Sequence, residues 1–142
     1  MKEFTELERD AWSGFISAWA TMNRIVEEDL QVNAQITHVE FEIILRLHWA
    51  KEHRMRIQDL AKQSLLTRSG TSRALARLEK AGLVVREVAD EDRRGAYAVL
   101  TKAGEQCFQK VAEPHMACVK ANFTDRFSEE ELKQMITFWQ RL

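Results

Sequence analysis

Large apolar side chains recur every three to five residues near the N-terminus, from Phe4 to about Leu30. This spacing predicts one long amphipathic helix with an aromatic face. A terminal helix with so many large aromatic residues needs a second surface to cover them. The apolar positions are Leu7, Trp12, Phe15, Trp19, Met22, Val26 and Leu30.

A second helical pattern begins at Thr37 and extends to about Ala50. Thr37 and Glu40 have the spacing of a capping box, in which each side chain binds an otherwise unpaired backbone N–H. Residues 55–57 then predict a single short strand.

Two short helices follow. Residues 57–64 predict the first, and Thr67 is a suitable N-cap for the second, which continues to the stop signal Gly82. Two short helices joined by a tight link are the pattern of a helix-turn-helix.

The periodicity changes after Gly82. Residues 83–89 and 96–101 are rich in β-branched and other strand-forming residues, and a charged turn at 90–95 ends in glycine. The pattern predicts a β-hairpin directly after the helix-turn-helix, which is a wing.

The C-terminal part is helical again. A helix is expected from Thr101 to about Asn122, interrupted or kinked at Pro114, which cannot donate a backbone hydrogen bond. Ser128 and Glu131 form a second capping box that starts a last helix. The predicted fold is therefore mainly α with a small β-hairpin wing.

Charge is unevenly distributed although the net charge is only −1. Residues 51–110 contain 13 lysines and arginines against 8 acidic residues, whereas the rest of the chain contains 8 against 14. A basic middle between acidic ends is typical of a module that meets phosphates. This favours nucleic acid as a partner of the middle segment.

The helix after Thr67 presents cations and short hydroxyl groups that cannot all be buried. Hydroxyls near a helix N-terminus suit phosphate oxygens, and an arginine can bind guanine in the major groove. The alternative is an ordinary solvated face. The predicted DNA contacts on this helix are Thr67, Arg68, Ser69, Thr71, Ser72, Arg73 and Arg77.

The turn of the hairpin carries two cations, Arg93 and Arg94. We expect Arg94, with Arg93 as the second choice, to enter a narrow minor groove. Asp90 or Asp92 would then stiffen the turn from within. The alternative is a surface turn held by salt bridges.

An ordered set of segments resembles the MarR family of winged helix-turn-helix regulators. The match is dense across residues 55–105. Its pieces are Arg56-Ile-Gln-Asp-Leu-Ala61, Leu66-Thr-Arg-Ser69, Arg73, Arg77-Leu-Glu-Lys80, Gly82-Leu-Val84, Asp90-Glu-Asp-Arg-Arg94 and Leu100-Thr-Lys-Ala-Gly104.

The resemblance implies a homodimer that binds a pseudo-palindromic DNA operator. In a single domain of 142 residues, segments 1–36 and 106–142 would form dimerisation helices and 37–105 the DNA-binding lobe. It also implies a repressor relieved by a small effector, often an anionic aromatic compound. Candidate pocket residues, which equally suit a plain core, are Trp12, Phe15, Trp19, Met22, His48 and Trp49.

Other classes of function are disfavoured. The chain has no glycine-rich phosphate loop and no nucleophile motif, so we expect no enzyme and no cofactor. Its four histidines show no i, i+4 pair, so we expect no metal site. Cys107 and Cys118 are expected to be unbridged, with a redox role left open.

The expected location is the cytoplasm. No apolar run approaches the roughly 18 residues of a membrane span, and the N-terminal residues lack the apolar core of a signal peptide. A winged-helix module that binds proteins instead of DNA remains the alternative function. A steep dependence of duplex binding on salt separates the two.

Overall fold

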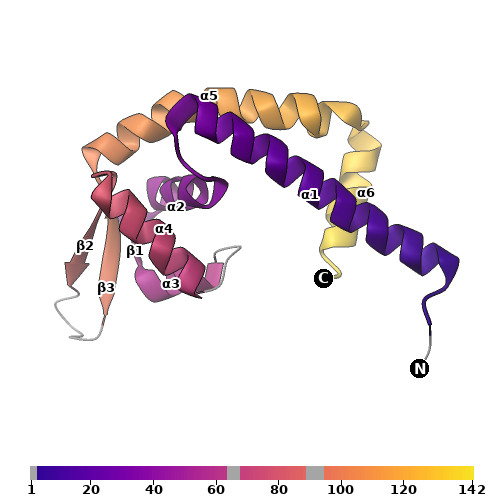
Figure 1. Ribbon diagram of the computed structural model, residues 1–142, viewed down its shortest axis with the longest axis horizontal. Helices are drawn as coiled ribbons and strands as arrows, with labels where there is room; N and C mark the ends of the chain where they lie inside the picture. The colour runs from indigo at the N-terminus through magenta and orange to yellow at the C-terminus, as the bar shows by residue number, and fades with distance from the viewer. Residues whose placement is uncertain (1–2, 64–67, 89–94) are drawn as a thin grey trace. The chain divides into compact units, whose positions relative to one another are not determined.

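The computed structural model describes residues 3–63, 68–88 and 95–142. The described chain is mostly helical, with one small antiparallel sheet (Figure 1), as the sequence predicted. Its elements are α1 (Glu6–Ala34), α2 (His38–Trp49), η1 (Lys51–His53), β1 (Arg54–Arg56), α3 (Ile57–Gln63), α4 (Arg68–Lys80), β2 (Val84–Val88), β3 (Ala96–Leu100), α5 (Lys102–Asn122), η2 (Thr124–Arg126) and α6 (Glu129–Trp139).

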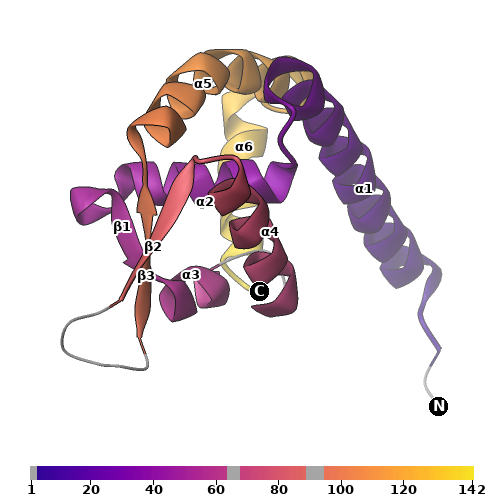
Figure 2. The ribbon, with the colours of Figure 1, turned by 60° about the vertical axis from the view of Figure 1, so that its left-hand side comes forward.

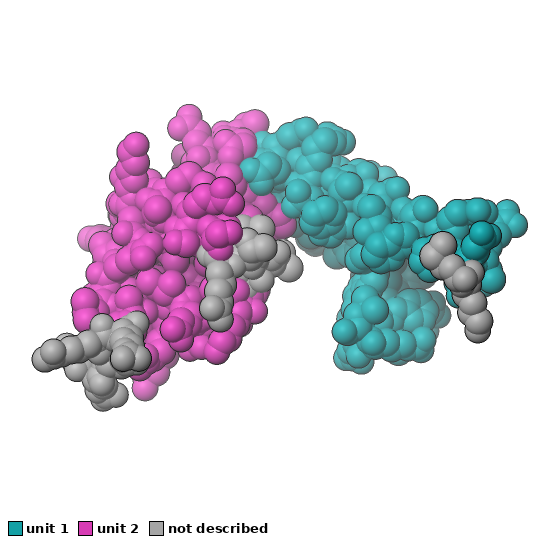
Figure 3. Space-filling model, turned by 60° about the horizontal axis from the view of Figure 1, so that its bottom comes forward, with its two compact units in different colours: residues 1–29, 115–142 teal, residues 30–114 magenta. Residues whose placement is uncertain are grey.

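The chain divides into two compact units (Figure 3). Unit 1 comprises Met1–Asp29 and His115–Leu142, and unit 2 comprises Leu30–Pro114. Unit 2 therefore contains the predicted helix-turn-helix and hairpin.

Unit 2 is built on a three-stranded antiparallel sheet with strand order β1-β3-β2. The predicted hairpin is present, with Val85 opposite Val99, and β1 adds to it by pairing with β3. Helices α2, α3 and α4 pack beside the sheet (Figure 2). Their shared core consists of side chains with at most 2% exposure, namely Phe41, Ile43, Ile44, Leu47, Leu60, Ala74, Leu75, Leu78, Val84 and Ala98.

The start of α2 confirms the predicted capping box. The backbone N–H of Glu40 donates to Thr37 Oγ1 at 3.2 Å, and that of Thr37 donates to Glu40 Oε2 at 2.9 Å. Because both contacts are local, the sequence alone determines them.

Unit 1 contains most of α1, the end of α5, and α6. Ser128 and Glu131 form the second predicted capping box, and the Ser128 N–H and hydroxyl hold the pKa of Glu131 below its usual value. Helix α5 continues through Pro114, so the proline does not end it.

The junction of α4, β2 and α5 depends on two glycines. Gly82 ends α4 in the left-handed region, with φ of 74°, and the Leu83 N–H reaches back to the Leu78 carbonyl. Thr101 caps α5 by accepting from the Gly104 N–H at 3.0 Å, while its hydroxyl donates to the Gly82 carbonyl. A Cβ on Gly104 would collide with the Leu83 carbonyl oxygen.

We expect Gly104→Ala to lower the free energy of unfolding by about 1–3 kcal/mol, because backbone at this junction must move to admit the methyl group. Gly14→Ala is the matched control, since a Cβ there meets nothing within 4 Å and α1 gains helix propensity. Urea denaturation measures both variants. Equal free energies of unfolding for the two variants would show that the junction has room for a methyl group on Gly104.

Candidate nucleic-acid interface

Helix α4 separates a buried face from an exposed one. Ala74, Leu75 and Leu78 enter the core of unit 2, while the opposite positions of the helix face solvent. Exposed positions three or four residues apart lie on one side of a helix. They form the α4 outer face, which we define as Ser69, Ser72, Arg73, Ala76 and Lys80.

The chemistry of the α4 outer face suits an anionic partner. The first turn of α4 contains no acidic residue. Arg73 is exposed and makes no hydrogen bond or ion pair with another described residue. Its guanidinium is therefore available to an external acceptor.

One predicted contact residue lies elsewhere. Thr71 was expected to face outward, but only 1% of it is exposed. It occupies the same side of α4 as Leu75 and Leu78, so the prediction that its hydroxyl meets DNA is wrong. The signal was present in the sequence, because Thr71 lies four and seven residues before Leu75 and Leu78 and therefore on the same helix face.

Arg77 has a partner inside the protein. Its Nε donates to Glu40 Oε1 at 2.5 Å, and the Glu40 side chain is only 7% exposed. The Arg77 side chain itself remains 55% exposed. Arg77 therefore neutralises a buried carboxylate on α2, and the exposed part of its side chain can still contact other groups.

The remaining predicted contacts of the interface cannot be placed. Thr67, Arg93 and Arg94 lie outside the described residues, as do Asp90 and Asp92. The backbone of Arg68 begins α4. The roles expected of these residues stay predictions.

Two cations near the hairpin were not singled out from the sequence. Arg56 and Arg86 line a hollow of about 180 Å³ together with Gly95 and Ala96. Arg86 is paired with Glu79, and the Arg56 guanidinium lies 5.3 Å from the centre of the Tyr97 ring. Only the pairing of β1 with β3 brings Arg56 to this place.

The residues proposed for an effector pocket are divided between the units. Trp12, Phe15, Trp19 and Met22 belong to unit 1, and His48 and Trp49 to unit 2. Within unit 2, Trp49 and Arg46 border a hollow of about 480 Å³. The other lining residues are Glu42, Leu45, Ala50, Met55 and Gln63.

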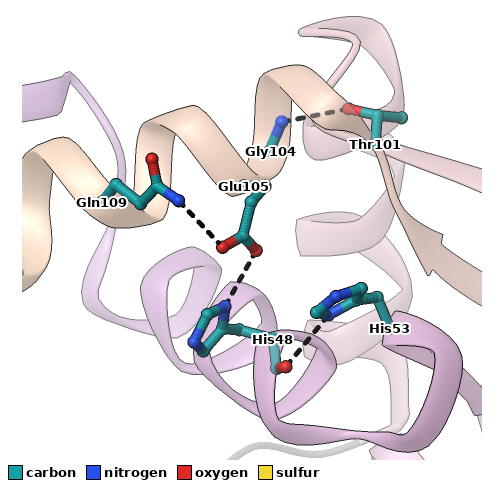
Figure 4. A network of polar contacts seen from close by, with 6 residues as sticks. All are labelled: His48, His53, Thr101, Gly104, Glu105 and Gln109. Atoms are coloured by element: carbon teal, nitrogen blue, oxygen red, sulfur yellow. Dashed lines mark hydrogen bonds and ion pairs between the residues drawn. The ribbon is translucent and has the colours of Figure 1, made fainter.

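The structure also brings together polar residues that the sequence analysis treated as separate (Figure 4). His48 Nδ1 donates to Glu105 Oε2 at 2.8 Å, and His53 Nδ1 donates to the His48 carbonyl at 3.0 Å. The hydrogen bond from His48 holds the pKa of Glu105 below its usual value.

Both cysteines are free, as expected. Burial raises the pKa of Cys107 and of Cys118, which lowers the fraction of reactive thiolate at neutral pH. The environment of the two thiols thus disfavours redox sensing.

We expect Arg77→Ala to lower the free energy of unfolding by about 1–2 kcal/mol, because it leaves the buried Glu40 carboxylate without its cation. The value stays modest because solvent reaches Arg77. Arg73→Ala is the matched control, with an expected change within about 0.5 kcal/mol. Indistinguishable denaturation midpoints for the two variants would contradict the structural role of Arg77.

No helix in the described ranges combines the length and apolar character needed to cross a membrane.

Residues 34–95 match the model of the MarR family. The chain is 40% identical over 80 residues to the HTH-type transcriptional regulator FarR of Neisseria gonorrhoeae. These residues make up 56% of this chain and 53% of that relative.

Two solved structures from Streptomyces coelicolor are similar over nearly the whole chain. Sco3205, a MarR family transcriptional regulator in complex with DNA, is 31% identical with a TM-score of 0.95, covering 99% of this chain and 88% of that one. AbsC, another MarR family transcriptional regulator, is 34% identical with a TM-score of 0.89, and the match covers 95% of this chain and 90% of AbsC. The chain belongs to the MarR family of transcriptional regulators.

Proposed function

We propose that the chain binds double-stranded DNA with sequence preference, with α4 in the major groove. The observation that carries this proposal is the α4 outer face, where Arg73 and Lys80 are exposed opposite the core-facing side. The likeness to Sco3205, which has been solved with DNA, supports it.

Each residue of the face has a role that follows from its chemistry. Arg73 can donate two hydrogen bonds to O6 and N7 of a guanine. Ser69 and Ser72 lie near the N-terminus of α4, where the helix dipole favours the negative charge of a phosphate group. Lys80 suits a phosphate as a flexible point charge.

The hairpin supplies the second contact of the proposal. Strands β2 and β3 are paired in antiparallel register from Val84 opposite Leu100 to Val88 opposite Ala96. We assign minor-groove contact to Arg94 or Arg93, with Asp90 or Asp92 stiffening the turn. Phosphate contacts by Thr67 and Arg68 complete the proposed interface.

Arg73→Ala is expected to weaken binding to a specific duplex by about 1–3 kcal/mol and to relax the preference at one base pair. Lys80→Ala should weaken all duplexes alike and reduce the slope of log affinity against log salt by about one. Fluorescence anisotropy at several salt concentrations measures both effects.

Arg24→Ala is the matched control for the loss of one positive charge, because Arg24 lies on α1 and pairs with Glu28. Unchanged affinity in Arg73→Ala would remove α4 from the groove. Wild-type protein that shows no salt-dependent binding to any duplex would favour the alternative, a winged-helix module that binds other proteins.

The proposed assembly is a homodimer held by segments 1–36 and 106–142. Unit 1 exposes more large apolar side chains than a helical unit of its size usually leaves in water. A stable dimer of this type buries over about 2,000 Å². The exposed side chains include Phe4, Leu7, Trp12, Phe15, Ile16, Trp19, Met116, Ile136, Phe138 and Trp139.

Ile136→Glu is expected to shift the protein towards monomer, because it places a charge on an apolar position that is 57% exposed in the single chain. Gln134→Glu, which adds the same charge at another exposed position of α6, should leave the dimer intact. Sedimentation velocity at micromolar concentration distinguishes these states. A stable, folded wild-type monomer would contradict the proposed assembly.

As a finer proposal, the dimer represses transcription by occupying an operator, and a small anionic aromatic effector releases it. The hollow beside Trp49 supports this part, since its lining combines the cation of Arg46 with apolar side chains that include Leu45 and Trp49. The other residues expected from the sequence, Trp12, Phe15, Trp19, Met22 and His48, are not among the lining residues of this hollow, and their role stays a prediction.

A further inference from the structure

Three side chains with metal-binding groups meet within unit 2, away from the α4 outer face. His48, His53 and Glu105 each place one nitrogen or carboxylate oxygen so that the three atoms lie within 4.8 Å of one another. We call this set the His-His-Glu cluster (Figure 4).

The cluster is assembled from three elements. His48 lies in the last turn of α2, His53 ends η1, and Glu105 lies in the first turn of α5. Glu52 and His53 both adopt left-handed backbone conformations, with φ of 58° and 53°. This turn brings the His53 ring back over the end of α2, where the rings of His48 and His53 stack at 5.9 Å.

The side chains are held in place by further contacts. The His48 ring stacks on Phe108 at 3.9 Å and meets the edge of Trp49 at 5.0 Å. Gln109 Nε2 donates to the second oxygen of Glu105 at 3.3 Å. Outer contacts of this kind orient the ligands of metal sites and reduce the cost of ordering them.

The cluster is also open to solvent. The side chains of His48 and Glu105 are 20% and 27% exposed, and His53 is exposed. A hydrated ion can therefore reach the cluster without opening the core.

The donor set selects the kind of ion. Two imidazoles and one carboxylate suit zinc and its neighbours among the transition metals, whereas Ca²⁺ and Mg²⁺ prefer oxygen ligands. Bonds of about 2.0–2.2 Å place tetrahedral ligand atoms roughly 3.4 Å apart. Closing the cluster around an ion thus takes side-chain shifts on the order of 1 Å, which rotation about the side-chain bonds provides.

We propose that His48, His53 and Glu105 bind one divalent transition-metal ion, with zinc as the ion that fits best and water as the fourth ligand. The ion replaces the direct hydrogen bond between His48 and Glu105 and joins α2, η1 and α5 within unit 2. This site is independent of the proposed contact with DNA.

The proposal departs from the expectation from the sequence that the chain has no metal site. His48 and His53 are five residues apart, which is not the i, i+4 spacing of two ligands on one helix face. The left-handed backbone at Glu52 and His53 brings the rings of His48 and His53 together, which a separation of five residues along a helix would not do.

The test is zinc titration of the full chain by isothermal calorimetry, without DNA. Cys107→Ser and Cys118→Ser form the background, so that thiolates cannot supply the binding. We expect one zinc ion per chain and a rise in the melting temperature with zinc, because an ion bound only by the folded chain stabilises it. The absence of stoichiometric binding at micromolar zinc would overturn the proposal.

Two variants test the assignment of ligands. His53→Ala and Glu105→Gln should each weaken zinc binding by about 10- to 100-fold or more, and circular dichroism checks that both remain folded. His38→Gln, which removes a histidine outside the cluster, should bind zinc as the background does. Affinity unchanged by His53→Ala, or reduced equally by His38→Gln, would place the zinc elsewhere and overturn the proposal.

Discussion

The position of α4 in unit 2 depends on the contact between the buried carboxylate of Glu40 and Arg77. One oxygen caps the start of α2 through the Thr37 N–H, and the other accepts from Arg77 on α4. A carboxylate that is almost fully buried is costly unless both a cation and hydrogen bonds compensate it. Glu40 therefore joins the start of α2 to α4 through hydrogen bonds and an ion pair, in addition to the apolar packing between the two helices.

This link divides the arginines near α4 into two groups. Arg77 and Arg86 are engaged by Glu40 and Glu79, whereas Arg73 has no described partner. A guanidinium already held by a carboxylate within the protein gains less from an external acceptor, because the first contact must be shared or given up. The positive charge of the segment thus overstates the number of cations available to DNA.

Helix α2 joins the two polar sites of unit 2. Glu40 lies in its first turn and supports α4, while His48 lies in its last turn and belongs to the His-His-Glu cluster. Between them, Phe41, Ile44 and Leu47 fill the core.

The sequence determined the local structure: both capping boxes, the strand-forming segments, and the order of helix-turn-helix and hairpin. These features arise from residues within a few positions of one another, so periodicity and cap chemistry are sufficient to predict them. The tertiary structure decided the pairing of Arg77 with Glu40, 37 positions away, and the contact of His48 with Glu105, 57 positions away. A side chain's partner across such separations depends on how helices pack, and no local pattern in the chain encodes that.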